Sequence, residues 1–332
     1  MKSNKRQFVG IHHVTAIAGN PQENLDFYVG ILGLRLVKRS VNQDDPGTYH
    51  FFYADAVGTP GTDLTFFAWP GGLRGRDGTG QLASVALAIP SGSMEYWMKR
   101  LADHGVPHEG PYRKFDEEVI TFSDVHGQAL ELVAAKDSSS RPWEFWADSP
   151  IPAQHAIRGI HGVVLKEASE YPTASFLTEH LGFRLVAEDG GRKRFAVGRG
   201  GSGAWLDLLI TPYAPRGRVG VGTIHHVAWR TPSDEEQKQW WQRIRNLGVP
   251  ISDIIDRFWF RSVYFPEPGG ALFEIATDGP GFMVDQAFGE LGTRLVLPPW
   301  LEPHRAEIER ALLPIHRPEF YTESGRIPTW ED

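Results

Sequence analysis

Short apolar runs alternate along the chain with Gly, Pro, Asn and Asp, and an early run at residues 14–17 predicts a strand. Asn20 is a preferred residue before the first turn of a helix, and Gly33 suits the left-handed conformation that ends one. Between them, apolar side chains at the spacing i, i+3, i+4 and i+7 predict one buried helix face: Leu25, Tyr28, Val29 and Leu32. Apolar and aromatic runs at 50–53 and 64–69 predict further strands. The order of strand, helix and about three strands describes a βαβββ module.

This module recurs along the chain. The segment Gly10–Val14 is repeated as Gly159–Val163, and the segment after the first helix is repeated at the same separation. A second pair of repeats is marked by the likeness of Ser84–Ala86 to His226–Ala228. Because repeated sequence indicates repeated structure, we predict four similar modules. They lie near residues 9–75, 81–135, 158–213 and 223–278.

The spacing of the modules predicts an α+β fold in two domains. The N-terminal domain would span residues 1–135 and the C-terminal domain residues 158–278, with two modules in each. Residues 136–157 are rich in Ser, Pro and Asp, which indicates a linker, although its aromatic residues suggest that it packs against a domain. Residues 279–332 lie outside the repeats and form a C-terminal extension, with one helix expected near 302–313.

Composition and charge exclude several kinds of site and partner. The net charge is −7 and no basic stripe stands out, which argues against nucleic acid as a partner. No run approaches the ~18 apolar residues of a membrane helix, and no secretory signal begins the chain, so we expect a cytoplasmic protein. The chain has no cysteine, which excludes disulfides, zinc–thiolate sites, iron–sulfur clusters and cysteine nucleophiles. A metal must therefore be bound by His, Asp, Glu or backbone groups.

Comparing the modules separates residues that build the fold from residues that carry chemistry. Positions needed for the fold should recur in every module, whereas positions used for chemistry need not. At one equivalent position of the first strand the four modules carry different residues: His13, Ser84, Gly162 and His226. In the last strand three modules carry a carboxylate: Glu131, Asp207 and Glu274. We interpret Glu131 and Asp207 as structural, because a carboxylate at a strand end often bonds nearby backbone, and their modules have no imidazole at the first-strand position.

Combining the first and fourth modules gives two imidazoles and one carboxylate. His13, His226 and Glu274 on one face of an ion would leave about three positions open, which suits a non-haem Fe(II) that binds substrate and O2 side by side. Mn(II) is an alternative, since similar ligands accept it. Zinc also remains open, but it would support hydrolytic or Lewis-acid chemistry instead.

The segments around these residues resemble the metal motifs of a known superfamily. His12-His13-Val14-Thr15, Ile224-His225-His226-Val227 and Gly269-Gly270-Ala271-Leu272-Phe273-Glu274 are similar to those of the vicinal oxygen chelate (glyoxalase/bleomycin resistance/dioxygenase) superfamily. Within it the likeness is to bacterial ring-cleaving dioxygenases that act on hydroquinones, and it covers roughly residues 8–280. The resemblance implies that the modules pair into two curved-sheet half-barrels around a metal site. It also implies that the first and fourth modules share that site, and that the cofactors are Fe(II) and O2.

The resemblance further implies a set of catalytic residues around the metal: Thr15, His225, Arg257, Tyr264 and His12. Alternation along a strand puts Thr15 on the same face as His13. The same alternation points His12 and His225 away from their neighbours unless the strand bulges. His225 or Tyr264 would transfer protons and Arg257 would stabilise developing negative charge. Phe258, Trp259 and Phe260 could form the walls of a pocket.

The function expected from these observations is Fe(II)-dependent cleavage of an aromatic ring. The substrates would be O2 and a small aromatic diol of the hydroquinone or catechol type, and homo-oligomerisation stays open. One alternative is a glyoxalase-type metal-dependent isomerase or transferase, which usually has a second carboxylate ligand. Another is a resistance protein that binds an aromatic ligand without catalysis, a class that loses the metal ligands.

Overall fold

The computed structural model describes residues 7–138 and 141–318, and these contain the four βαβββ modules that the repeats predict. The first module comprises β1 (Ile11–Ala18), α1 (Pro21–Leu25) with the π-helical turn η1 (Asp26–Ile31), β2 (Arg35–Asn42), β3 (Asp45–Ala54) and β4 (Asp63–Ala68). The fourth comprises β13 (Thr223–Thr231), α4 (Asp234–Asn246), β14 (Ile255–Asp256), β15 (Arg261–Pro266) and β16 (Leu272–Thr277).

The second and third modules have the same order of elements. The second comprises β5 (Gln81–Ile89), α2 (Met94–Asp103), β6 (His108–Lys114), β7 (Glu117–Ser123) and β8 (Ala129–Ala134). The third comprises β9 (Ile160–Glu167), α3 (Tyr171–Ser175) with the π-helical turn η3 (Phe176–His180), β10 (Arg184–Asp189), β11 (Arg192–Ala196) and β12 (Trp205–Ile210).

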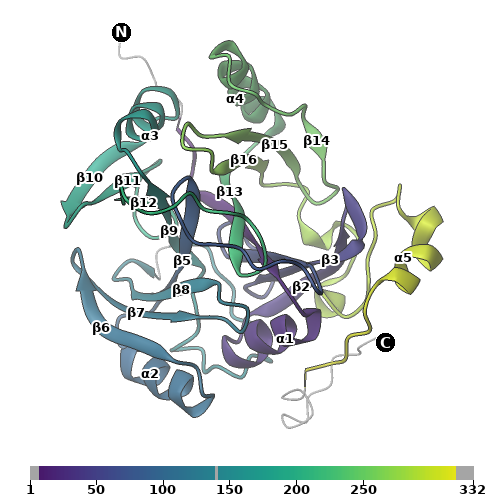
Figure 1. Ribbon diagram of the computed structural model, residues 1–332. Coiled ribbons are helices and arrows are strands. Elements are labelled where there is room, and N and C mark those ends of the chain that lie inside the picture. The colour runs from purple at the N-terminus through teal and green to yellow at the C-terminus, as the bar shows by residue number, and fades with distance from the viewer. Residues whose placement is uncertain (1–6, 139–140, 319–332) are drawn as a thin grey trace.

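The strands form two curved eight-stranded sheets, each a half-barrel (Figure 1). One sheet has the order β14-β15-β16-β13-β1-β4-β3-β2 and therefore joins the fourth module to the first. The other has the order β10-β11-β12-β9-β5-β8-β7-β6 and joins the third to the second. The junctions are the antiparallel pairs β1–β13 and β5–β9. The α+β fold of paired modules is thus confirmed, and each sheet takes one module from each half of the chain.

The first helix begins and ends where its sequence predicts. The Asn20 side chain accepts hydrogen bonds from the backbone N–H groups of Gln22 and Glu23, which have no partner inside the helix. Gly33 follows the helix with φ +71°, a conformation that a residue with a Cβ adopts at a cost. The predicted apolar face is fully buried, since its four side chains are at most 1% exposed: Leu25, Tyr28, Val29 and Leu32. Only the π-helical turn η1 departs from the regular helix that the spacing predicts.

The linker between the halves packs against the first module, as its aromatic content suggested. Trp146 and Ile151 are buried, and the Ser149 hydroxyl donates to the Gly33 carbonyl at 2.8 Å. Ala56 N–H donates to the Glu144 carbonyl at 2.9 Å. The domain limits at residues 135 and 158 stay a prediction, because each sheet contains strands from both sides of the linker.

The C-terminal extension covers the first sheet near β2 and β3 (Figure 1). It contains the short 3-10 turns η4 (Phe282–Val284), η5 (Phe288–Glu290) and η6 (Glu302–His304), and α5 (Arg305–Ala311). The last two occupy the region where one helix was predicted. The buried Lys38 ammonium donates to Asp285 and Gln286, each at 2.6 Å, which attaches the extension to β2. Apolar side chains from both parts form one cluster, including Phe52, Trp259, Phe282 and Val296.

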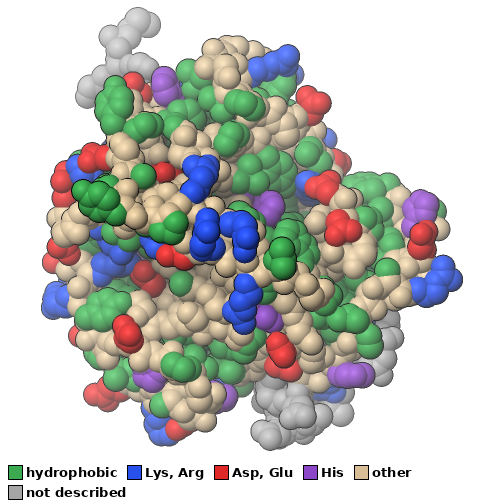
Figure 2. Space-filling model, viewed as in Figure 1, with side chains coloured by type: hydrophobic (Ala, Val, Ile, Leu, Met, Phe, Trp, Pro, Cys, Tyr) green, Lys and Arg blue, Asp and Glu red, His purple; other side chains and the backbone are tan. Residues whose placement is uncertain are grey.

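The surface carries no extended region of one charge on the face drawn in Figure 2, where acidic and basic side chains are interspersed around a small central group of Lys and Arg. Four arginines are exposed on the segments that join β4 to β5 and β12 to β13: Arg74, Arg76, Arg216 and Arg218. These segments pair through isolated bridges and tie the two half-barrels together. Within the described residues, no helix has the length and apolarity needed to cross a membrane.

Candidate metal centre

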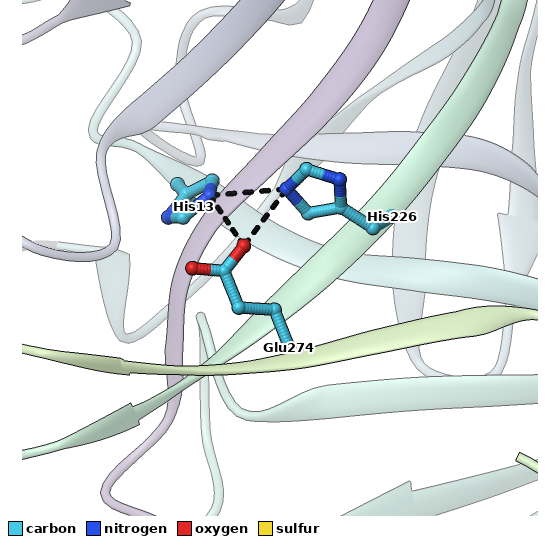
Figure 3. Close-up of side chains that lie close together, drawn as sticks. All are labelled: His13, His226 and Glu274. Carbon is cyan, nitrogen blue, oxygen red and sulfur yellow. Dashed lines mark hydrogen bonds and ion pairs between the residues drawn. The ribbon is translucent and has the colours of Figure 1, made fainter. Parts of the chain in front are cut away.

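The three residues predicted as metal ligands converge on one buried point (Figure 3). His13 on β1, His226 on β13 and Glu274 on β16 lie on three neighbouring strands of the first sheet. The two Nε2 atoms are 3.3 Å apart. Glu274 Oε2 is 3.3 Å from His13 Nε2 and 2.9 Å from His226 Nε2. No other group of this kind occurs among the residues that the structure describes.

A β-bulge in each of β1 and β13 sets the direction of the ligand histidines. The register between the two strands passes from Ile11 opposite Trp229 to His13 opposite Ala228, so His12 is an extra residue in β1. His225 is the extra residue in β13. A bulge breaks the strict alternation of side chains, so adjacent residues can approach the same side. This is why His12 and His225 stay beside the centre, contrary to simple alternation.

Each ligand histidine contacts the histidine that precedes it. His13 Nδ1 lies 2.9 Å from His12 Nδ1, and His226 Nδ1 lies 2.7 Å from His225 Nδ1. Burial, together with the adjacent ligand histidine, lowers the pKa of His12 and of His225 to about 3, so both imidazoles are neutral. A neutral imidazole can accept, at Nδ1, a hydrogen bond from Nδ1 of the ligand histidine. The lone pair of each Nε2 is then free to face Glu274, and such contacts fix the orientation of a metal-binding imidazole.

The two carboxylate oxygens of Glu274 have different neighbours. Oε1 accepts a 2.6 Å hydrogen bond from the Ser262 hydroxyl on β15, whereas Oε2 is buried without a hydrogen bond. Burial favours the neutral acid, but His13 and His226 outweigh it and hold the pKa of Glu274 well below its usual range. A buried carboxylate oxygen that faces two imidazole lone pairs has the arrangement that a divalent cation completes. The residues therefore fit a metal.

The Glu274 carboxylate also affects the pKa values of the two ligand imidazoles. Burial disfavours protonation of His13, but the Glu274 charge outweighs it and raises the pKa of this imidazole. Burial lowers the pKa of His226, and Glu274 offsets only part of that effect. A metal must displace any proton that His13 shares with Glu274, so binding should release protons.

A cavity of about 30 Å³ opens beside the centre and has both polar and aromatic walls. Trp259 and Phe260, predicted as wall residues, line it together with Phe52 and Phe67. Phe258 lies outside this lining and packs against Trp259 and Trp300 instead. Its φ of +74° is strained for a residue with a side chain. The polar lining comes from Asn42, Gln43, His50, Arg257 and Tyr264 in addition to the two ligand histidines.

Arg257 and Tyr264 form one side of this cavity. Tyr264 lies opposite Glu274 in the β15–β16 register, and its ring is 5.6 Å from that of His226. Burial and the Glu274 charge raise the pKa of Tyr264, so its hydroxyl keeps its proton. The Arg257 guanidinium lies over the Tyr264 ring at 5.5 Å and binds both oxygens of Asp44, at 3.2 and 2.8 Å. The structure thus brings both predicted residues to the centre.

Thr15 lies beside the centre in a different way. Its hydroxyl contacts that of Thr65 on β4 at 2.7 Å. The register of β1 with β4 pairs Thr15 with Thr65, as the register of β13 with β16 pairs Ala228 with Glu274. Thr65 therefore occupies, in the first module, the position that Glu274 occupies in the fourth. A hydroxyl thus stands where a second carboxylate ligand would have to be.

The second half-barrel uses the equivalent positions to hold an ion pair. Glu131 lies opposite Ala86 and Asp207 opposite Val164, which repeats the register that places Glu274. The buried Lys114 ammonium contacts the Glu131 carboxylate and lies 3.5 Å from Asp207. This side-chain cation lies between two carboxylates, so the interpretation of Glu131 and Asp207 as structural agrees with their contacts.

Three residues around the centre escaped the sequence analysis: Ser262, Thr65 and His50. Ser262 could have been found, because it precedes Tyr264 by two residues and so lies on the same face of its strand. Thr65 could have been found only with the strand register. His50 carried no local signal, since one histidine in a run of strand residues is usually unremarkable.

Comparison with known proteins agrees with this architecture. The sequence profile described as "Glyoxalase/Bleomycin resistance protein/Dioxygenase superfamily" matches residues 10–132 and 172–275. The chain is 42% identical to "Putative ring-cleaving dioxygenase MhqO" of Bacillus subtilis (strain 168), over 93% of this chain and 97% of that protein. It is 30% identical to the "Chlorohydroquinone/hydroquinone 1,2-dioxygenase" of Sphingobium indicum, over 91% and 95%. A crystal structure of a "putative dioxygenase" from Bacillus subtilis superposes with a TM-score of 0.86 at 41% identity, covering 94% of this chain and 99% of that one.

Proposed function

This chain belongs to the glyoxalase/bleomycin resistance protein/dioxygenase superfamily, and from that premise we propose that it is a ring-cleaving dioxygenase that uses Fe(II) and O2. The substrate would be a small aromatic diol of the hydroquinone or catechol type. The names of two similar proteins support the reaction, and one of them specifies hydroquinones. The arrangement of two histidines and one glutamate supports Fe(II), because it leaves positions open for two further ligands.

One observation carries the metal assignment: Glu274 Oε2 is buried and lies within 3.3 Å of the Nε2 atoms of both His13 and His226. Three atoms that can bind a metal therefore converge at one buried point, which a divalent cation would bridge. His13, His226 and Glu274 would hold the ion. When bound, Fe(II) would supply the electronic connection between an electron-rich ring and O2, and Mn(II) is the alternative ion.

The surrounding residues would bind the diol and move its protons. His225 and His12 hold the ligand imidazoles in the tautomer that leaves each Nε2 free. The protonated Tyr264 hydroxyl can donate a hydrogen bond to an oxygen of the substrate, and Arg257 beside it can stabilise negative charge that develops there. Thr15 acts through its contact with Thr65.

The cavity must widen when a diol binds, because about 30 Å³ is smaller than an aromatic ring. The Arg257 wall is the part that can move most easily. Its partner Asp44 is 70% exposed, and an ion pair with an exposed partner contributes only about 0–1 kcal/mol. The ligand strands are paired on both sides and would keep their positions.

The position of Thr65 separates this proposal from a glyoxalase-type reaction. Such an enzyme would need a second carboxylate ligand, and a threonine stands at that position here. Retention of three potential ligands likewise disfavours a resistance protein that only binds an aromatic compound. The cytoplasmic location stays a prediction.

Metal analysis and oxygen uptake test the proposal. Anaerobically reconstituted protein should bind about one Fe(II) per chain, and addition of methylhydroquinone or a catechol should consume O2 and give a new absorbing product. The His226→Ala variant should lose the iron and the activity, whereas His155→Ala should keep both, because His155 packs against Tyr96 away from the centre. Full iron binding by His226→Ala, or no uptake with a panel of diols, would contradict the assignment.

A further inference from the structure

An imidazole outside the two histidine pairs faces the same cavity. His50 lies on β3 and lines the cavity with His13 and His226. Its ring is held between the aromatic rings of Phe52 and Phe67, with centroids at 3.9 and 4.5 Å. Its strand is paired on one side with β2, where His50 faces Ser40, and on the other with β4. His50 is therefore a fixed part of the wall, unlike the side formed by Arg257 and Asp44.

The two nitrogens of His50 differ in their partners. Nε2 lies 2.9 Å from the Thr65 hydroxyl, which contacts the Thr15 hydroxyl at 2.7 Å. Nδ1 has no hydrogen bond to any group in the described part of the chain, and it is not among the polar atoms sealed from solvent. In a residue that lines the cavity, such a nitrogen is open to a ligand.

The contacts of His50 allow its Nδ1 either to donate or to accept a hydrogen bond. Burial, with the neighbouring His13 and His226 adding to it, holds the pKa of His50 well below its usual range, so the ring is neutral. A neutral imidazole has one N–H and one lone pair. Because the Thr65 and Thr15 hydroxyls can each donate or accept, Nε2 can carry the proton or lack it. Nδ1 can correspondingly accept a hydrogen bond from a ligand or donate one to it.

Three other polar residues of the wall already have hydrogen-bond partners. The Gln43 amide donates to the Arg257 carbonyl at 2.9 Å, and the Asn42 side-chain oxygen accepts from Asp44 N–H. Arg257 is bound to Asp44. Nδ1 of His50 therefore offers a fixed hydrogen-bonding atom without a partner, on the side of the cavity that its ring shares with Phe52 and Phe67.

The positions of the hydroxyls in a diol decide what this atom can bind. An ortho diol presents both oxygens to the same side of the ring, where both can reach a metal. A para diol with one oxygen at the metal carries its second hydroxyl to the opposite side of the ring, into the cavity wall. Burying that hydroxyl without a partner is unfavourable, so a para diol needs a hydrogen-bonding group there.

We propose that His50 is a specificity-determining residue that binds, through Nδ1, the hydroxyl lying across the ring from the metal-bound oxygen, and that it thereby selects para diols over ortho diols. This inference rests on the proposed dioxygenase function and names its substrate class. Thr65 and Thr15 are positioning residues, because they act on the substrate only through His50.

Equilibrium binding to the iron-loaded protein without O2 tests this role apart from turnover. The ligands are hydroquinone, catechol and 4-methylphenol, which has a methyl group in place of the second hydroxyl of hydroquinone. The wild-type protein should bind hydroquinone about tenfold more tightly than 4-methylphenol, as one hydrogen bond to a buried hydroxyl allows. His50→Phe should abolish this preference while binding 4-methylphenol with a Kd within about twofold of wild type. His50→Gln, which keeps a donor and an acceptor, should restore part of the preference.

The outcomes separate the role of His50 from the proposed function. Iron content and melting temperature of each variant should match the wild type, which excludes a folding defect. If His50→Phe keeps the preference for hydroquinone, or weakens all three ligands equally, the inference is overturned although the enzyme remains a dioxygenase. A wild-type protein that cleaves catechol and ignores hydroquinone would overturn it in the same way. A wild-type protein that binds iron and no diol would overturn both.

Discussion

At the scale of single residues, each candidate ligand of the centre has a contact that fixes the orientation of its side chain. Each ligand imidazole is oriented by the histidine before it, through Nδ1. The glutamate is oriented by a serine that holds one oxygen and leaves the other free. A centre whose ligands are fixed before the ion arrives loses little conformational entropy on binding, so the residues behind the ligands should matter nearly as much as the ligands.

Removing the hydroxyl of Ser262 tests this expectation. In Ser262→Ala, Glu274 Oε1 loses its 2.6 Å hydrogen bond, and the carboxylate is free to rotate away from the histidines. We expect the affinity for Fe(II) to fall roughly 10- to 100-fold while the fold is retained. Competition with a chelator measures this affinity. The matched control is Ser84→Ala, which removes the similar contact of Ser84 with Glu131 in the other sheet and should leave the affinity unchanged.

A buried carboxyl pair gives the protein a predictable response to pH. Burial and the neighbouring charge of Glu267 raise the pKa of Glu167 to about 8, from an ordinary value near 4.5. An acid whose folded pKa exceeds its unfolded pKa stabilises the fold only while it is protonated. Its contribution is therefore complete below about pH 4.5 and is lost as the pH rises through about 8.

The Glu167→Gln variant should show this sign directly. The free energy of unfolding of the wild type should fall between pH 5 and pH 8 by more than that of Glu167→Gln, which has no proton to lose there. Denaturant titrations at several pH values measure the difference. The exposed Glu109→Gln variant should follow the wild type. Parallel curves for the wild type and Glu167→Gln would contradict the assignment.

At the scale of elements, the two half-barrels use the same strand positions for different purposes. In the first sheet, the last strand of each module holds Thr65 or Glu274, and the first strand of each module holds one of the two ligand histidines. In the second sheet they hold small residues and two carboxylates, with the Lys114 ammonium between the carboxylates. The Lys114 and Arg194 cations are covalently part of the chain and neutralise the two carboxylates of the second sheet permanently, whereas the first sheet would take an ion from solution.

Replacing Lys114 should therefore affect stability and leave metal binding intact. Lys114→Met leaves the buried Glu131 carboxylate without its cation, whereas Asp207 keeps Arg194, and should lower the free energy of unfolding by about 3–5 kcal/mol. Urea denaturation measures this loss. Lys99→Met breaks an exposed ion pair with Asp103 and should cost about 0–1 kcal/mol. Equal losses in the two variants, or loss of iron in Lys114→Met, would show that Lys114 has another role.

At the scale of the whole molecule, neither half of the chain can complete a sheet or the centre by itself. His13 comes from the first module, and His226 and Glu274 come from the fourth. The junction pairs β1–β13 and β5–β9 both join strands from opposite sides of the linker. Separated halves would expose these strand edges, which favours aggregation.

Dividing the chain within the linker tests this dependence. Fragments 1–157 and 158–332 should be poorly soluble when they are expressed alone, and neither should bind Fe(II) tightly. Expressed together, they should purify as one complex with about one iron per pair, because the sheets restore both junctions. A soluble 1–157 fragment that folds independently, as shown by a cooperative thermal transition, would favour the two sequence-defined domains over the crossed pairing.

The sequence by itself determined the modules and the candidate ligands. Helix and strand periodicity are local properties, so Leu25, Tyr28, Val29 and Leu32 revealed a buried face, and the repeats revealed four copies of it. Comparison of the copies singled out His13 and His226, because the equivalent positions carry Ser84 and Gly162, and joined them with the Glu274 carboxylate of the fourth module.

The tertiary structure decided how these parts meet. Strand register and β-bulges arise from pairing between segments far apart in the chain, so alternation alone could not place His12 and His225. The same non-local pairing brings Ser262 to Glu274, places Lys114 between two carboxylates, and turns His50 toward the cavity beside the ligands. Local sequence does not predict such neighbours, because contacts between strands far apart in the chain form only when the sheets assemble.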